Sequence, residues 1–265
     1  MKVFLAAAVS AAMAGSLFSA EALKPAEPAD FTGWVRCIKK SGEGIRLSGN
    51  YVAITIQSAK KINVDLKKKY RITCDYRVAP GGKNGAKFYF APVCYDKNGN
   101  VLNAAPQNCY PGTDTVLAAP AKKGDKTVTI KDGAKWVVQW GNIAFNTKPD
   151  FSDLPNNEYA AFTAINKKGD VWELILAKPL AKDYPAGTNV REQRNGASFR
   201  YMLGNVLPTS EWQQFSRVIS GGKGETEPGY PFAWRIGTAQ AGVVIFTNGK
   251  PADIDFRNIS IVEEK

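Results

Sequence analysis

The end of the chain contains the stretch that decides the fold: EWQQFSRVI (211–219), VVIF (243–246), the turn Asn248-Gly249, and IDFRNISIV (254–262). β-Branched and aromatic residues dominate each run. Asn-Gly between two such runs favours a type I′ hairpin turn, because both central residues need a positive φ. We therefore expect the chain to close with antiparallel strands, the last two of them joined as a hairpin.

The final run changes the face on which its apolar residues lie. Ile254 and Phe256 share one parity, whereas Ile259 and Ile261 share the other. A uniform strand would expose half of them, since successive side chains alternate between the two faces of a sheet. A β-bulge near Arg257-Asn258 resolves the conflict, and we predict one there.

Period-two alternation of apolar and polar residues recurs earlier, in the runs 52–56, 62–66 and 70–76. Turn sequences separate the runs, and residues 159–165 and 171–176 flank a Lys-Gly-Asp turn that predicts another hairpin. We find no stretch of a dozen residues with the i, i+3, i+4, i+7 apolar spacing of a helix. The sequence therefore predicts an all-β protein with little helix.

Three segments resemble strands of the secreted jelly-roll carbohydrate-binding modules of families four and nine. Ile254–Ser260 is similar to their closing strand, Tyr70–Thr73 to a strand of their first half, and Trp212–Phe215 to a Trp-containing strand of their second half. The resemblance implies a jelly-roll β-sandwich of two antiparallel sheets that binds carbohydrate. Fold alone does not fix function, so the site must be argued from its residues.

The chain begins with Met1-Lys2 and a short apolar run, followed by Ala20-Glu21-Ala22, which predicts a secretory signal over residues 1–22. Residues 23–30 read as a tether. We expect 31–265 to form one sandwich with a loop and hairpin insertion at about 146–205, where Pro, Asn and Gly are frequent. The alternative is two smaller β domains meeting near Pro149. The pattern of this insertion resembles exported β-sandwich proteins of polysaccharide-degrading bacteria.

The chain contains four cysteines and no histidine, and these counts limit the catalytic and metal sites that it can form. In an exported protein the cysteines permit two disulfides, and Cys94 with Cys109 is the first expectation because they flank one turn region; burial as free thiols is the alternative for Cys37 and Cys74. Without histidine, Ser-His-Asp and Cys-His catalysis and His-based zinc sites are excluded. We expect no cofactor.

A structural calcium is common in the resembled modules, often with help from an aspartate of the closing strand. Arg257 occupies that position here, and Asp253 and Asp255 are only adjacent substitutes. A hard cation needs several converging oxygen ligands, so a solvated strand edge is the simpler interpretation.

The net charge is +11 and stays +11 without residues 1–22, which contain one Lys and one Glu. A basic exported protein is biased towards anionic partners such as an acidic polysaccharide, while spread lysines also serve solubility. Nucleic acid does not fit the expected compartment, and no second stretch is apolar enough to span a membrane. The expected partner is a glycan, anionic or neutral.

Flat aromatic faces stack on sugar rings, and nearby polar groups bind the hydroxyls. We assign the strand residues Trp34, Trp136, Trp172, Trp212 and Phe88 to the core. The candidates for carbohydrate binding are the aromatics beside polar or flexible residues and two arginines of the insertion: Trp140, Tyr184, Arg191, Arg194, Tyr201 and Trp234.

Two catalytic alternatives remain, together with a structural envelope protein that binds no small ligand. A polysaccharide lyase would use Tyr184 or Tyr201 as acid or base, with Arg191 neutralising a uronate. A glycosidase would need two fixed carboxylates, but Glu225 and Glu227 lie in a Gly-rich loop. A binding protein without turnover is the prediction.

Overall fold

The computed structural model describes residues 22–42, 44–227 and 229–264. Within these ranges the regular structure consists of strands and four 3₁₀ turns, which confirms the all-β prediction. The 3₁₀ turns are η1 (Pro28–Asp30), η2 (Val35–Cys37), η3 (Ala105–Gln107) and η4 (Tyr230–Phe232). The predicted signal peptide lies outside the described residues except for Ala22.

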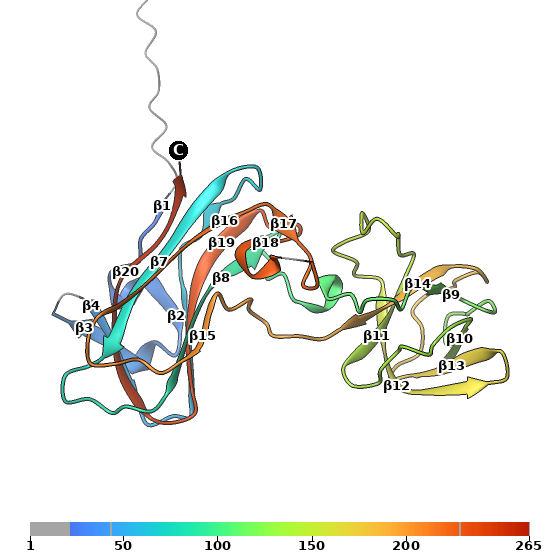
Figure 1. Cartoon of the computed structure of the whole chain (residues 1–265), viewed down its shortest axis with the longest axis horizontal. Helices are drawn as coiled ribbons and strands as arrows, with labels where there is room; N and C mark the ends of the chain where they lie inside the picture. Colours follow the sequence, from blue (N-terminus) through green and yellow to red (C-terminus); the bar gives the residue numbers. More distant parts are fainter. Residues whose placement is uncertain (1–21, 43, 228, 265) are drawn as a thin grey trace, which may run out of the picture.

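Two antiparallel sheets form a sandwich (Figure 1). In strand order the first sheet contains β16 (Gln213–Ser220), β7 (Lys69–Val78), β20 (Ala252–Glu264), β4 (Gly44–Gly49) and β3 (Ile38–Ser41), with β1 (Ala22–Leu23) also paired to β20. The second contains β15 (Leu203–Val206), β8 (Lys87–Tyr95), β19 (Gln240–Asn248), β5 (Ala53–Ser58) and β2 (Phe31–Gly33), with β6 (Ile62–Asn63) also paired to β19. This architecture is compatible with a jelly roll.

The core of the sandwich follows from the alternation in the sequence. On β7, Tyr70, Ile72 and Cys74 are buried, whereas Arg71 between them is exposed. Aliphatic and aromatic side chains from both sheets join one cluster, in which Tyr76 stacks on Phe88 with ring centroids 4.7 Å apart. Burial of such apolar surface is the dominant favourable contribution to folding.

The two strands that close the chain are long and neighbouring in sequence, yet they do not pair with each other. β19 pairs with β8, β5 and β6, while β20 pairs with β7, β4 and β1. The predicted hairpin is therefore wrong: the turn at Asn248-Gly249 carries the chain from one sheet to the other. Val243 and Ile245 on β19 and Ile254 and Phe256 on β20 face the same core from opposite sides.

The predicted bulge in the closing strand is confirmed. The pairing of β20 with β7 shifts register between Arg257 and Ser260, and Asn258 adopts a φ of 51°. The shift turns Ile259 and Ile261 back into the core that Ile254 and Phe256 occupy.

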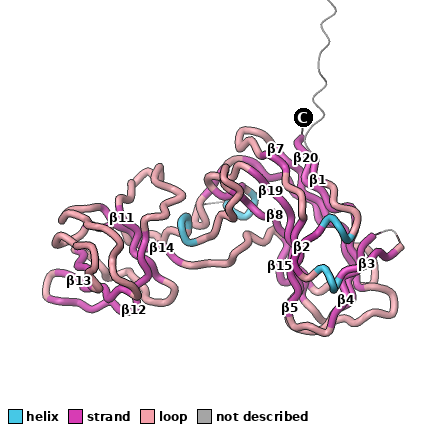
Figure 2. The backbone as a smooth tube through the Cα atoms, turned by 180° about the vertical axis from the view of Figure 1, so that it is seen from behind, coloured by secondary structure: helices cyan, strands magenta, loops and turns pink. Residues whose placement is uncertain are grey.

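The chain between β8 and β15 forms a second β unit with a separate hydrophobic core, placed beside the sandwich (Figure 2). Its sheet order is β10 (Thr127–Ile130), β13 (Val171–Leu176), β12 (Tyr159–Lys168), β11 (Gly141–Phe145), β14 (Asn189–Arg194) and β9 (Thr115–Val116). The predicted hairpin of residues 159–176 is present as β12 and β13. The expected insertion at about 146–205 covers only the later part of this unit.

The six strands of the inserted unit close on themselves. The amide of Lys131, just after β10, donates to the carbonyl of Val116 on β9 at 3.0 Å, and Ala118 donates to Thr129 at 2.9 Å. These bonds join the two outer strands of the sheet order. We call the resulting unit the strand ring.

Trp136 is expected in a strand, but residues 136–140, which precede β11, do not form one. Trp136 instead buries its ring in the core of the strand ring, and its indole Nε1 donates to the carbonyl of Thr113 at 3.1 Å. Val137 donates its amide to the buried Glu192 carboxylate at 3.0 Å. Both contacts replace the strand pairing that the apolar run suggested.

Buried arginines fasten the strand ring to the sandwich near the short parallel pair β17 (Gly222–Lys223) and β18 (Trp234–Arg235). The guanidinium of Arg235 donates to the carbonyls of Leu102, Ala197 and Ser198 at 2.5, 3.0 and 2.7 Å. Leu102 lies on the chain segment entering the ring and the other two on the segment leaving it. Arg235 therefore holds both connections at one point.

Candidate functional site

Trp140 and Arg194 lie near each other at one edge of the strand ring. The Trp140 side chain is 67% exposed, and its carbonyl accepts the amide of Asn195 at 3.0 Å. Arg194 pairs with Gly141 on the neighbouring strand, and its guanidinium lies 3.4 Å above the Tyr110 ring and 2.7 Å from the Glu192 carboxylate. Trp140 offers a free ring, while Arg194 is already engaged.

Three of the six candidates, Trp234, Arg191 and Tyr184, are buried, and for Trp234 and Arg191 the expectation that they face a ligand is corrected. Trp234 has no exposed surface and packs edge-on against Tyr70 in the sandwich core. Arg191 is 1% exposed, and it donates to the Asp153 carboxylate at 2.9 Å and to the Lys148 carbonyl at 3.3 Å. The Trp234 ring fills the core, and the buried charge of Arg191 needs its carboxylate partner.

Tyr201 is half-buried against Tyr89 and Phe246, with ring centroids 5.0 and 5.9 Å away. It lines a cavity of about 350 Å³ where the two units meet, together with Arg200, Glu225 and Tyr230. The Arg200 guanidinium donates hydrogen bonds to the Glu225 carboxylate and to the carbonyls of Tyr230, Ala233, Trp234 and Lys223. This cavity is therefore chiefly a structural junction.

The residues assigned to the core are placed as expected in two cases. Phe88 and Trp136 are buried, at 0% and 6% exposure, whereas Trp172 and Trp212 are half-buried. Trp34 is 37% exposed, so its assignment to the core is wrong. Its apolar neighbour Val35 is exposed as well.

The expected disulfide is absent, and all four cysteines are free, buried thiols. Cys94 belongs to the sandwich core, whereas Cys109 pairs with Gln193 in the strand ring. Within the described ranges no cluster of acidic or cysteine side chains has the composition of a metal site. Asp255 is instead held by Arg46 at 2.7 Å, and Asp253 by the Ser48 hydroxyl and the Lys83 amide.

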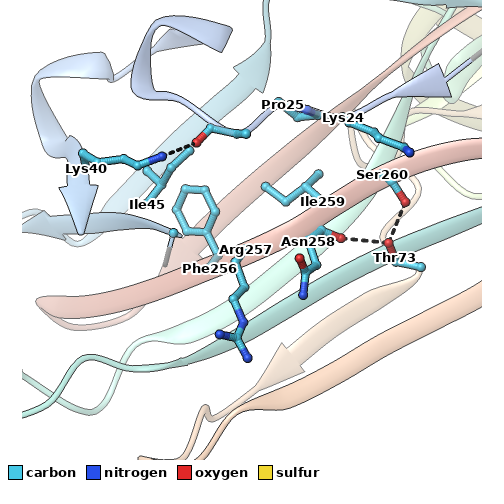
Figure 3. Close-up of a pocket in the computed structure, with 12 residues that line it drawn as sticks. Lys24, Pro25, Lys40, Ile45, Thr73, Phe256, Arg257, Asn258, Ile259 and Ser260 are labelled. Atoms are coloured by element: carbon cyan, nitrogen blue, oxygen red, sulfur yellow. Dashed lines mark hydrogen bonds between the residues drawn. The ribbon is translucent and has the colours of Figure 1, made fainter. Parts of the chain in front are cut away.

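A pocket of about 400 Å³ lies beside the bulge of β20 (Figure 3). Its polar groups are partly satisfied within the protein, because Thr73 is 2.7 Å from the Ser260 hydroxyl and 2.8 Å from the Asn258 carbonyl. The aromatic residue in its wall, Phe256, is fully buried. The pocket therefore lacks an exposed ring on which a sugar would stack.

A larger cavity of about 510 Å³ lies on the strand ring, and we call it the tyrosine groove. It runs between the start of β12 and the segment that follows β13, and it is lined by Asn142, Phe145, Asn157, Glu158, Tyr159, Ala160, Ala161, Ala177, Lys178, Pro179, Leu180, Ala181, Lys182 and Tyr184. Two tyrosines, several small residues and a polar rim make up this lining.

Small side chains create the space in the groove. Ala160 and Ala161 on β12 lie beside Ala177 after β13, whose amide donates to the Ala161 carbonyl at 2.8 Å. Tyr159 lies on the same face of the strand as Ala161, and its side chain is 38% exposed. The result is a concave, largely apolar surface with an aromatic residue at its edge, which is typical of small-ligand sites.

The wall of the groove is rigid. Tyr184 stacks on Phe145 with ring centroids 3.9 Å apart and an interplanar angle of 13°. Its backbone pairs with Ala121 through bonds of 2.7 and 2.9 Å. Burial raises the pKa of the Tyr184 hydroxyl to about 12, so this group is a neutral hydrogen-bonding partner at physiological pH.

The rim carries an ion pair and free polar groups. Lys182 lies 2.9 Å from Glu158, which also accepts from the Asn146 amide at 2.8 Å. The hydrogen bond from Lys182, followed by that from Asn146, lowers the pKa of Glu158. Exposed Asn157 and Lys178 complete the rim.

Sequence reasoning identified Tyr184 and missed Tyr159. The sequence pattern places Tyr159 at the start of a hairpin strand, which gives no information about what covers its ring. The available signal was the alanine at position 161, because residues i and i+2 of a strand lie on the same face and a methyl group covers little of a neighbouring ring. Ala177, which completes the gap, is distant in sequence.

Neither a protein-family model nor a curated protein sequence matches this chain. No helix in the described part of the chain has the length and apolar character needed to cross a membrane.

Proposed function

We propose that the protein is an exported, non-catalytic carbohydrate-binding protein that holds one stretch of a glycan in the tyrosine groove. The observation that carries this proposal is the open ring of Tyr159 beside a concave surface cleared by alanines. The apolar CH face of a pyranose ring stacks on such an aromatic face without requiring a buried charge.

The polar rim supplies the second part of sugar recognition. Glu158, Lys182 and Asn157 offer acceptors and donors at the edge of the groove, where hydroxyl groups of a stacked sugar would lie. The Glu158–Lys182 pair has no net charge and Lys178 adds one positive charge, and a neutral sugar fits this rim because its hydroxyl groups accept hydrogen bonds from the ammonium groups. Several polar groups around one aromatic contact give orientation as well as affinity.

The geometry does not favour the lyase alternative. Arg191 is sealed and paired with Asp153, so it is not free to neutralise a uronate. Burial raises the pKa of both Tyr184 and Tyr201 to about 12, which opposes formation of a phenolate base near neutral pH. A binding role needs neither group to titrate.

Electrophoresis in native gels containing a soluble neutral glycan tests the proposal. We expect xylan, hydroxyethylcellulose or galactomannan to retard the protein, and Tyr159→Ala to weaken retardation about tenfold, or about 1.4 kcal/mol. Tyr159→Phe keeps the ring and should retain most of the binding.

Val101→Ala is the matched control, because Val101 is also 38% exposed but lies outside the groove. Equal retardation of Tyr159→Ala and the wild type, or no retardation by any neutral glycan, would contradict the proposal. Incubation with polygalacturonate and absorbance of unsaturated ends would reveal a lyase.

A further inference from the structure

A second aromatic surface lies at one end of the sandwich, far in sequence from the tyrosine groove. The rings of Trp34 and Tyr51 meet with centroids 4.7 Å apart and an interplanar angle of 63°, and they are 37% and 42% exposed. The guanidinium carbon of Arg36 lies 5.0 Å from the first ring centroid and 5.3 Å from the second. We call these three residues the Trp34–Arg36–Tyr51 platform.

The backbone fixes this platform. Gly33 has a φ of 93°, and a Cβ there would meet the Thr55 carbonyl oxygen at 2.7 Å, so only glycine lets the chain pass this close to β5. Trp34 then donates its amide to Thr55 at 3.2 Å and accepts that of Cys37 at 2.9 Å. The Trp34 ring is thus presented from a tight turn.

The surroundings of the platform are basic. Asn50, next to Tyr51, accepts a hydrogen bond from the Lys83 ammonium, and Gly249, next to Lys250, donates to the Val52 carbonyl at 2.9 Å. The Asp253 carboxylate accepts hydrogen bonds from the Ser48 hydroxyl and from the amide of Lys83.

The Arg36 guanidinium lies over two rings and, among the described residues, not beside a carboxylate. Within the described residues, no carboxylate forms an ion pair with it. A cation held between two exposed rings favours a ligand that combines a flat apolar face with an anionic group.

We propose that the Trp34–Arg36–Tyr51 platform is a second carbohydrate site, selective for an anionic sugar such as a uronate. The sugar ring stacks on an aromatic face, and Arg36 binds its carboxylate. The inference extends the proposed function to a second site and a charged class of glycan. A membrane surface fits less well, because the two rings with exposed Val35 and Val52 form a small apolar patch and stable anchoring needs a larger buried area or an acyl chain.

Native gels containing polygalacturonate test this site directly. We expect Trp34→Ala and Arg36→Gln to weaken retardation by polygalacturonate at least fivefold and to leave retardation by xylan unchanged. Arg36→Lys should be intermediate, since it keeps the charge but loses the planar guanidinium. Rising salt should weaken binding of the wild type more than that of Arg36→Gln.

Lys131→Gln is the charge-matched control, because it removes one exposed positive charge on the strand ring. Circular dichroism of each variant establishes that it folds. If Lys131→Gln and Arg36→Gln weaken binding equally, attraction by net charge explains the effect and the platform proposal is overturned.

The proposals for the tyrosine groove and for the platform can be contradicted independently, because each is tested with its own variant and its own glycan. Loss of xylan binding in Tyr159→Ala concerns only the groove, and loss of polygalacturonate binding in Trp34→Ala concerns only the platform. Unchanged polygalacturonate binding in folded Trp34→Ala overturns the platform. A second result would also overturn it: the protein sediments with vesicles of phosphatidylcholine and phosphatidylglycerol, this binding is lost in Trp34→Ala, and polygalacturonate binding is not.

Discussion

The side-chain amide of Asn258 donates a 2.7 Å hydrogen bond to the carboxylate of Asp75 across the bulge of the closing strand. Asn258 also has a φ of 51°, a conformation that asparagine and glycine tolerate better than other residues. One residue therefore both turns the strand and ties it to its neighbour, β7.

Replacing Asn258 should separate these two effects. We expect Asn258→Ala to lower the free energy of unfolding by about 1.5 kcal/mol, because the hydrogen bond is lost and alanine is strained at positive φ. Asn258→Gly loses the bond but relieves the strain, so about 0.5 kcal/mol is expected. Urea denaturation measures both, and equal losses in the two variants would show that φ is unimportant here.

Arg235→Lys should loosen the attachment of the strand ring. Lysine keeps the charge but cannot reach the three carbonyls of Leu102, Ala197 and Ser198 together with Glu225. We expect a loss of about 2 kcal/mol and new cleavage near residues 195–199 in limited proteolysis. A proteolytic pattern identical to that of the wild type would contradict the role of Arg235 as a clamp.

The Glu158–Lys182 pair predicts a small, pH-dependent contribution to stability. Its partners are 44% and 51% exposed, so screening by solvent limits the contribution to about 0.5 kcal/mol. The pKa of Glu158 is lowered from 4.5, so the contribution is present above pH 4.5 and is lost as the pH falls through the folded-state value. In urea denaturation, Glu158→Gln should be less stable than the wild type at pH 7 and equal to it at pH 2. A difference that persists at pH 2 would point to packing instead.

The thiols should be unreactive in the folded protein. All four cysteines are buried, and burial raises the pKa of Cys74 and that of Cys109, the latter to about 11. Titration with a thiol reagent at pH 8 should detect none in the native state and four after unfolding without reductant. Only two thiols after unfolding would indicate a disulfide.

The sequence predicted those features that depend on local alternation. The bulge followed from the parity of Ile254 and Ile259 alone, and the hairpin of β12 and β13 from its turn. The hairpin predicted at Asn248-Gly249 was wrong because the same dipeptide occurs in hairpin turns and in turns that connect two sheets. The choice depends on which strands pair with β19 and β20, and partners such as β5 and β4 lie near the other end of the sequence.

Exposure of aromatic residues was harder to predict than secondary structure. Trp34 and Trp234 each follow a flexible or apolar neighbour, yet the first is exposed and the second is sealed. The exposure of each ring depends on whether another segment of the chain covers it, as the core around Tyr70 covers Trp234. Such contacts between distant segments leave no periodic signal in the chain.

The chain leaves the sandwich at Leu102 and returns at Ala197, and one guanidinium reaches both places. Because the two ends of the inserted unit lie close together, the intervening ninety or so residues form a replaceable insertion. A short glycine-serine bridge would span the gap, and a different module could be grafted at the same junction without stretching the host scaffold.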